Sequence, residues 1–422
     1  MRYPILSFWV LLTLLLFSAS CESRGKSPAH ERVAETATDF SELPDDVQAQ
    51  LEALGYVIAT DLERGVVGVT VHDEVRAQPG WNLYASMHAR EAILMDMEGR
   101  ELHRWTGPSE PQGDGTQIQL GLWWRTVRLF PNGDLLAQAD FGSLMKVDAD
   151  SRLLWTYDEV CHHDFDVAPD GRIFLITGKG VITHERFVHP LTEDFVVELA
   201  ANGVELRRVS LLKALVDAGQ EEILLELRKF QLGASGIERP DVTHLNALQI
   251  LGAPSPAAPE AFVEGRLLLS TPKNSRIMIM DFERGEVVWS LAGSFRYQHD
   301  PTLTDDGRVL LFDNKGGGDK RSRILALDPG SGTELWSYGG ASDPQLFSEC
   351  CGRVHPLKNG NLLGIVSMEG RAIEITPERE IVWEFRSAHE FGGKIAILND
   401  VERIDPASLD PAFVARVLRS AN

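Results

Sequence analysis

The sequence predicts an all-β protein, a six-bladed β-propeller with four-stranded blades. The first observation is a segment that occurs six times: an apolar strand, a short polar turn and a second strand that in five copies ends near a tryptophan. These segments are residues 92–105, 144–157, 195–209, 277–291, 324–338 and 372–385. The second observation is a hairpin around a turn such as Pro-Asn-Gly or Asp-Asp-Gly, which precedes most of them. Two hairpins make one four-stranded unit.

The spacing of the tryptophans is the third observation. Trp289, Trp336 and Trp383 recur at 47 residues (336−289 and 383−336), which is typical of a propeller blade. Between Trp155 and Trp289 the gap is longer than two such periods. Residues 211–232 explain the surplus, because their apolar spacing and charge pairs predict a helical insertion between the third and fourth blades. A short amphipathic helix is predicted at about 407–420.

The N-terminal part predicts export. Residues 1–20 have one arginine, an apolar run too short to cross a membrane with ease, and then small residues, which is the pattern of a signal peptide. The small residues before Cys21 resemble a bacterial lipobox, so we expect lipidation of Cys21; ordinary cleavage nearby is the alternative. Residues 21–64 are polar and predict a tether with a short helix, followed by the propeller at 65–422. The expected location is the periplasm or cell envelope, with the lipid as the sole membrane anchor.

Composition restricts the ligands. The chain has 41 basic and 62 acidic residues, a formal net charge of −21, 43% apolar residues and four cysteines. Nucleic-acid binders need a basic surface, so nucleic acid is not an expected partner. Any anionic ligand must be held by a few placed cations. Cys161, Cys350 and Cys351 allow at most one internal disulfide, or they are free thiols.

Histidines recur at one position of the repeat. His163 and His299 each lie eight residues before a turn glycine, and Arg125 occupies the same position of its own unit. Aligning "THLNALQIL" with "QHDPTLTDD" places His244 with His299. In a propeller the first strands of the blades converge on the central axis. We therefore expect His163, His244, His299 and Arg125 to surround the mouth of the channel.

Two further candidates are less regular. His355 lies five residues before its glycine, in register with Arg128, Asp166 and Thr302, so whether it points into the channel is open. Arg323 ends the glycine-rich stretch "NKGGGDKRSR", where a guanidinium can bind an oxyanion with two hydrogen bonds.

At this point the sequence resembles the bacterial arylsulfotransferase family, which consists of six-bladed propellers. The motifs that carry the resemblance are "HHDFDVAPDGRIFL", "DVTHLNALQIL", "QHDPTLTDDGRVLLFDN" and "VHPLKNGNLLGI", and it extends from about residue 65 to 390. It implies transfer of a sulfuryl group from a phenolic sulfate ester to another phenol, through a transiently sulfated histidine and without a nucleotide donor or other cofactor.

The resemblance also assigns roles. His163, His244, His299 and Arg323 match the family's histidines and arginine, and the sulfated histidine, toward the C-terminus, matches His355 or His389. We therefore take His163, His244, His299, Arg323 and His355 as the catalytic candidates. Arg125 and Asn246, which follows His244 in the D-x-x-H-x-N element, are the substrate-binding candidates. The expected partners are a small aryl sulfate and a phenol, and no metal is expected.

Two other functions remain open. Channel histidines can bind zinc or calcium with help from carboxylates, which would give a metal-dependent lyase or hydrolase. Alternatively, the propeller could be a non-catalytic scaffold of the envelope. The chain contains no P-loop and no G-x-G-x-x-G between a strand and a helix, so it predicts no nucleotide site.

Overall fold

The computed structural model describes residues 59–60, 65–108, 123–182, 185, 187, 191–233, 241–253, 258–341, 343–391 and 393–420. All of them belong to one compact unit of the chain, residues 37–422. The predicted signal peptide, Cys21 and nearly all of the predicted tether lie outside the described residues. Among the helices that the structure describes, none is both long enough and apolar enough to span a membrane.

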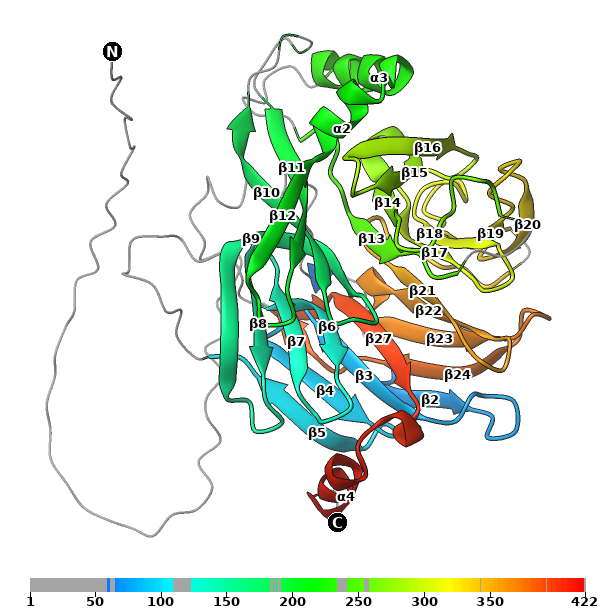
Figure 1. Ribbon diagram of the computed structural model, residues 1–422. Coiled ribbons are helices and arrows are strands. Elements are labelled where there is room, and N and C mark those ends of the chain that lie inside the picture. Colours follow the sequence, from blue (N-terminus) through cyan, green and yellow to red (C-terminus); the bar gives the residue numbers. More distant parts are fainter. Residues whose placement is uncertain are drawn as a thin grey trace, which may run out of the picture. The chain divides into compact units, whose positions relative to one another are not determined.

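The fold is an all-β propeller, as predicted (Figure 1). One four-stranded sheet contains β27 (Leu398–Ile404), β3 (Trp81–Ser86), β4 (Glu91–Met95) and β5 (Glu101–Thr106). A seven-stranded sheet contains β6 (Trp124–Leu129), β7 (Leu135–Ala139), β8 (Gly142–Val147), β9 (Leu153–Val167), β10 (Ile173–Ile182), β11 (Leu191–Leu199) and β12 (Glu205–Ser210).

The remaining sheets follow in chain order. The second four-stranded sheet contains β13 (Ala247–Ile250), β14 (Leu267–Thr271), β15 (Arg276–Asp281) and β16 (Glu286–Ala292). The third contains β17 (His299–Leu303), β18 (Val309–Asp313), β19 (Arg323–Leu327) and β20 (Glu334–Tyr338). A five-stranded sheet contains β21 (Arg353–Pro356), β22 (Leu362–Val366), β23 (Arg371–Ile375), β24 (Ile381–Arg386) and β2 (Gly68–His72). A small sheet contains β1 (Ala59–Thr60), β25 (Glu390–Phe391) and β26 (Lys394–Ala396).

The prediction of six separate four-stranded blades is wrong, because two of the predicted units share one sheet. β9 is one uninterrupted strand of 15 residues: its first part pairs with β8 and its last part with β10, so two predicted units are joined in the seven-stranded sheet. The physical reason is that residues 158–164, "DEVCHHD", contain no glycine or proline to end the strand. The chain therefore runs from the outer edge of one unit into the inner strand of the next.

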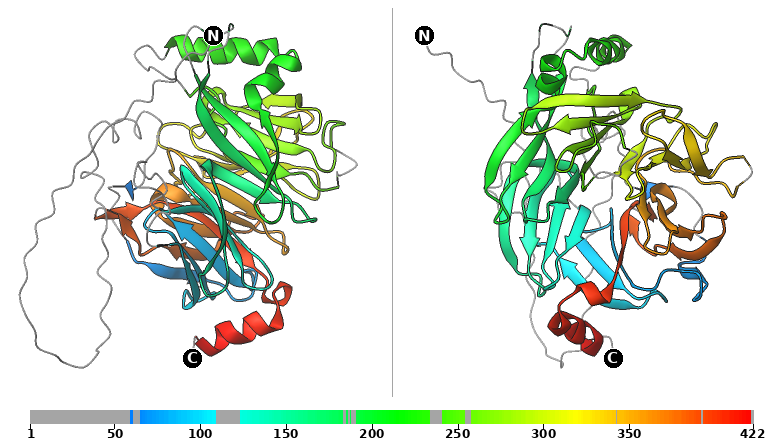
Figure 2. Two further views of the ribbon diagram at one scale, coloured as in Figure 1. Left: turned by 60° about the vertical axis from the view of Figure 1, so that its left-hand side comes forward. Right: turned by 45° about the vertical axis from the view of Figure 1, so that its right-hand side comes forward.

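The inner strands are neighbours around a common centre. β6 contacts β9, β9 contacts β13, and the series continues through β17, β21 and β27 back to β6 (Figure 2). β27 was not predicted. It comes from the C-terminal part of the chain and pairs with β3 near the N-terminal part, so it closes the ring. This arrangement brings residues that are distant in sequence to one axis.

The recurring tryptophans have a common function in packing. The indole N–H of Trp105 donates to the carbonyl of Gly133 at 2.9 Å, and that of Trp383 donates to the carbonyl of Met97 at 2.9 Å. Both indoles are fully buried. Each links a strand of one unit to a turn of the next, which explains why these two units have a tryptophan at this position.

The helices lie at the predicted positions. The insertion consists of α2 (Leu211–Asp217) and α3 (Glu221–Gly233), which come between β12 and β13. The hydroxyl of Ser210 accepts the backbone N–H of Lys213 and so caps α2. At the C-terminus, α4 (Pro411–Ser420) buries Phe413 and Val417.

Candidate active site

A small pocket lies where the inner strands begin. Its volume is about 20 Å³, enough for roughly one water molecule. It is lined by Arg125, His163, Asn246, His299, Asp300, Cys351, Gly352, Arg353 and Asn399. The structure thus brings together Arg125, His163 and His299, three of the four residues that the sequence placed at the channel mouth. His244 joins them, because its ring packs against that of His163 with centroids 4.7 Å apart.

The backbone at this pocket is unusual. His163, His244, Asp300 and Cys351 all have positive φ angles, between 48° and 63°. Such conformations cost about 1–3 kcal/mol each for residues other than glycine and are concentrated at functional sites. The pairings of β9 and β17 also shift register near these residues. The strained starts of the inner strands therefore set the direction of the pocket side chains.

His299 is held as a neutral imidazole. The amide nitrogen of Asn314 donates to the carbonyls of Ser348 and Cys351, so its oxygen faces His299 Nδ1 at 2.8 Å. Nδ1 must therefore carry the proton, and Nε2 accepts the backbone N–H of Cys351 at 3.2 Å. Burial, together with the positive charge of Arg125, lowers the pKa of His299 to about 3.

Burial and Arg125 also keep His163 neutral, but its Nδ1 faces another histidine, His162. Burial and the neighbouring Arg125 lower its pKa well below the ordinary value. Its Nδ1 lies 2.8 Å from Nδ1 of His162, whose Nε2 lies 3.3 Å from an oxygen of Asp194. When His162 donates to Asp194, it accepts the Nδ1 proton of His163. A buried carboxylate is thus connected through His162 to His163, whose Nε2 then holds the lone pair.

His244 has an acidic partner of its own. Nδ1 of His244 and its backbone N–H both bond to Asp241, the latter at 2.9 Å. Although burial raises the pKa of Asp241, the interaction with His244 outweighs it and lowers that pKa to about 2. An ionised Asp241 accepts a hydrogen bond from Nδ1 of His244 and so fixes the orientation of its ring.

Arg353 was missed by the sequence analysis. Its guanidinium lies 2.9 Å from Asp164, 3.3 Å from Asp300 and 3.8 Å from Asp400, and it donates to Thr126 Oγ1 at 2.8 Å. These partners come from four different inner strands or strand starts. Because Arg353 lines both the small pocket and a larger cavity beside it, it separates the two.

The larger cavity has a volume of about 310 Å³. Its lining includes Arg128, Asp166, Thr302 and His355, the four residues that share one register of the repeat. The channel therefore has two layers: one at the position of His163 and His299, and a second three residues further along each strand. His355 is in the channel but not in the small pocket.

His355 is a cation rather than a nucleophile. Its Nε2 lies 2.7 Å from Asp400 Oδ1. Burial lowers the pKa of His355, but the charge of Asp400 outweighs it and raises the pKa to about 9. Both ring nitrogens are therefore protonated at neutral pH, and the imidazole has no lone pair for attack. The sequence left open whether His355 points into the channel; it lines the larger cavity and not the small pocket.

The pair also makes stability depend on pH. Because the folded-state pKa of His355 lies above the unfolded value near 6.5, the pair stabilises the fold fully below that value and loses its effect as pH rises toward 9. We expect His355→Asn to destabilise the protein by about 2–3 kcal/mol more at pH 6 than above pH 9. Urea denaturation at both pH values measures this difference. Asp400→Asn should show the same trend, and a difference independent of pH would contradict the assignment.

Arg323 does not lie where the sequence analysis placed it. It lines neither cavity, and its guanidinium is bound to Asp313 at 2.7 Å and Glu334 at 3.1 Å. Asp313 also accepts the backbone N–H of Gly316 at 2.8 Å, and a Cβ at Gly316 would lie 2.0 Å from the carboxylate. The glycine-rich loop thus wraps around the chain's own carboxylate instead of a ligand.

Arg125 and the cysteines form the other side of the small pocket. Arg125 binds Asp140 at 2.9 Å and lies 3.6 Å from the sulfur of Cys351. Cys161, Cys350 and Cys351 are all free thiols, so the internal disulfide that was left open does not form. A hydrogen bond from Cys350 and the charge of Arg125 outweigh burial and lower the pKa of the Cys351 thiol to about 7.

One family of known proteins matches most of the described propeller. The family model for arylsulfotransferase (ASST) matches residues 127–388, which is 262 of the 422 residues. This range contains His163, His244, His299 and His355. No curated protein matches the sequence.

Several solved structures are similar only in outline. A protein of unknown function from Bacteroides caccae has 15% identity and a TM-score of 0.46, covering 77% of this chain and 98% of that one. Virginiamycin B lyase from Staphylococcus aureus has 11% identity and a TM-score of 0.43, covering 79% and 88%. The WD40 propeller domain of Doa1 has 11% identity and a TM-score of 0.42, covering 82% and 95%. These scores are too low to support an inference. The family match covers more than half of the sequence, and the chain therefore belongs to the arylsulfotransferase (ASST) family.

Proposed function

We propose that this protein transfers a sulfuryl group from an aryl sulfate ester to a phenol, and that His163 carries the group between the two. The observation that supports this most is the neutral state of His163 beside Arg125 in a member of the arylsulfotransferase family. A neutral imidazole is a nucleophile, and the guanidinium can stabilise charge on the sulfuryl oxygens.

His163 suits the role of nucleophile better than His299. When Nε2 of His163 attacks sulfur, the ring becomes positive, and its Nδ1 proton can shift toward His162 and the carboxylate of Asp194. Among the residues that the structure describes, Nδ1 of His299 meets only the neutral oxygens of Asn314 and Tyr297, so a positive charge on that ring has less support. We assign His299 to hydrogen bonding and shape within the pocket.

The transfer takes place in two half-reactions. In the first, the bond from His163 nitrogen to sulfur forms as the bond from sulfur to the aryl oxygen breaks, and the leaving phenoxide takes a proton from Nε2 of His244. In the second, the acceptor phenol returns a proton to His244 and its oxygen displaces His163 from sulfur. Asp241 holds His244 in both steps.

Other residues would recognise the substrate. The side-chain oxygen of Asn246 lines the small pocket and has no hydrogen-bond partner among the described residues, so it can accept the hydroxyl of the phenol. Phe141, which stacks on His162, and the half-buried Tyr297 can contact the aromatic ring. A sulfuryl group is larger than the small pocket, whose volume is about 20 Å³. We therefore expect the pocket to widen when substrate binds.

The assay uses para-nitrophenyl sulfate with and without an added phenol. We expect a burst of nitrophenolate close to one equivalent of enzyme without acceptor, and steady turnover only when the phenol is present. A chelator should leave turnover unchanged. Steady hydrolysis without a phenol, or activity that is lost with the chelator, would argue against the proposal.

We also propose that the protein is exported to the periplasm or cell envelope and anchored through a lipid on Cys21. The support is the pattern of residues 1–20 and the small residues before Cys21. Labelling of the expressed protein with a radioactive fatty acid tests it. We expect incorporation into the native sequence and none into Cys21→Ser.

A further inference from the structure

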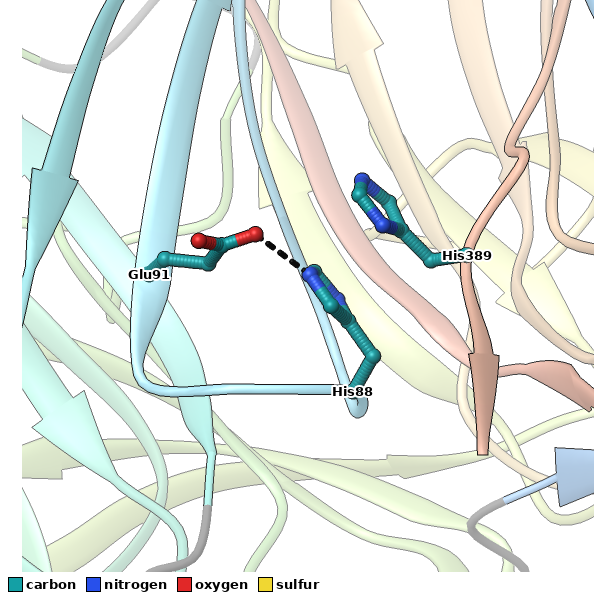
Figure 3. A group of neighbouring side chains, drawn as sticks. All are labelled: His88, Glu91 and His389. Atoms are coloured by element: carbon teal, nitrogen blue, oxygen red, sulfur yellow. Dashed lines mark hydrogen bonds and ion pairs between the residues drawn. The ribbon is translucent and has the colours of Figure 1, made fainter. Parts of the chain in front are cut away.

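Three side chains outside the small pocket and the larger cavity form a separate group, His88, Glu91 and His389 (Figure 3). His88 is in the turn between β3 and β4, Glu91 begins β4, and His389 is in the loop between β24 and β25. One nitrogen of each imidazole and one carboxylate oxygen all lie within 4.8 Å of one another. The side chains of His88 and Glu91 are only 10% and 12% exposed.

Each imidazole of this group is oriented by a hydroxyl. Nδ1 of His88 is hydrogen-bonded to Ser86 Oγ, and its Nε2 lies 2.5 Å from Glu91 Oε1. Nε2 of His389 lies 3.1 Å from the hydroxyl of Tyr84. Metal-binding histidines in proteins commonly bond through the second ring nitrogen to an outer partner that fixes the ring. Ser86 and Tyr84 are placed to act in this way.

Two stacked imidazole rings and a carboxylate meet in this group. The rings of His88 and His389 are stacked with centroids 3.6 Å apart and planes within 10° of parallel. The lone pair of an imidazole nitrogen lies in the plane of the ring, so one of the two rings must turn before both can bind a single metal ion. One carboxylate oxygen of Glu91 lies 2.5 Å from Nε2 of His88, so this carboxylate is placed to balance the charge of a bound cation.

Arg104 is the one competitor for Glu91 that the structure identifies. Its Nη1 lies 2.5 Å from Glu91 Oε1. The same guanidinium also donates to Glu101 through Nε at 3.0 Å and Nη2 at 2.5 Å. Arg104 therefore keeps a carboxylate partner when Glu91 binds something else. A hydrogen bond can connect only His88 and Glu91, whereas a metal ion can be coordinated by all three side chains.

We propose that His88, Glu91 and His389 bind a divalent transition-metal ion, with zinc as the best match. Two imidazole nitrogens and one carboxylate oxygen are a known ligand set for zinc, and they leave a fourth position for water or another ligand. The site does not depend on the proposed sulfuryl transfer, since it shares no residue with the small pocket.

Zinc and cobalt binding to the full-length protein tests this site. After dialysis against chelator, we expect the wild type to take up about one equivalent of zinc by titration calorimetry. Cobalt(II) should give visible absorption bands of a four-coordinate site. His88→Ala and His389→Ala should each weaken binding by at least about 100-fold, and Tyr84→Phe by about 10-fold. His103→Gln, a half-buried histidine bonded to the carbonyl of Ala149, is the control and should bind normally.

Circular dichroism checks that each variant is folded, and Glu91→Gln provides a third ligand variant if an alanine variant is not. The proposal is overturned if the wild type binds neither metal at millimolar concentration. It is also overturned if the folded ligand variants bind as the wild type does, or if His299→Ala abolishes binding while they do not.

Discussion

Replacement of His163 by alanine is expected to lower kcat for sulfuryl transfer by at least about a thousandfold, because it removes the atom that forms the covalent intermediate. The burst of nitrophenolate should disappear together with turnover. Stopped-flow absorbance with para-nitrophenyl sulfate measures both. His103→Gln, remote from the pocket, should leave kcat within about twofold of the wild type.

A second variant separates loss of the nucleophile from loss of structure. His162→Gln keeps His163 but breaks its link to Asp194, so we expect a slower burst that still reaches one equivalent. If His163→Ala retained more than a tenth of the wild-type kcat and still showed a burst, another residue would have to be the nucleophile.

The largest effect on stability is expected for Arg353→Met. This change leaves Asp164, Asp300 and Asp400 facing one another without the cation between them. Removing one partner of a buried ionic group typically costs about 3–5 kcal/mol. Without Arg353 the pKa values of Asp164 and Asp400 should rise, so the loss should be smaller at pH 5, where these two carboxyl groups can take up protons, than at pH 8.

Urea denaturation at both pH values measures this loss. Arg128→Met is a matched control: Arg128 binds Asp166 and Glu402, but its side chain is 41% exposed, so we expect less than about 1 kcal/mol. A loss of less than 1 kcal/mol for Arg353→Met, or the same loss at both pH values, would contradict the role we give to the guanidinium.

Local sequence patterns predicted the sheets because each hairpin is encoded by alternation and by its turn residues. The tryptophan period holds for a physical reason: the indoles of Trp105 and Trp383 each bond to a turn of the next unit. β27 escaped prediction because its partner β3 lies more than 300 residues away, and no short-range pattern records that pairing. One indication in the sequence was overlooked: the first repeat has no inner strand of its own, so another part of the chain must provide it.

Channel residues could be predicted where they occupy equivalent positions in the repeated units. Counting back from the turn glycines placed His163 and His299 in one layer and His355 in the other. The partners that set their charge could not be found in this way. Asp400 comes from β27, which was not predicted. Asn314 and Arg353 do not lie eight or five residues before a turn glycine, so counting back from the glycines does not find them. Arg323 was misassigned because a glycine-rich loop wraps a buried carboxylate as readily as it binds an external anion.

The central claim is that the neutral imidazole of His163 carries the sulfuryl group from the donor to the acceptor. The direct measurement is mass spectrometry of peptides from enzyme mixed with aryl sulfate, without acceptor, and digested under alkaline conditions that preserve sulfo-histidine. We predict one added sulfuryl group on the peptide that contains His163, and its loss when a phenol is added before digestion. A sulfuryl group on the peptide of His355 or His389 instead, or none on any peptide despite active turnover, would contradict it.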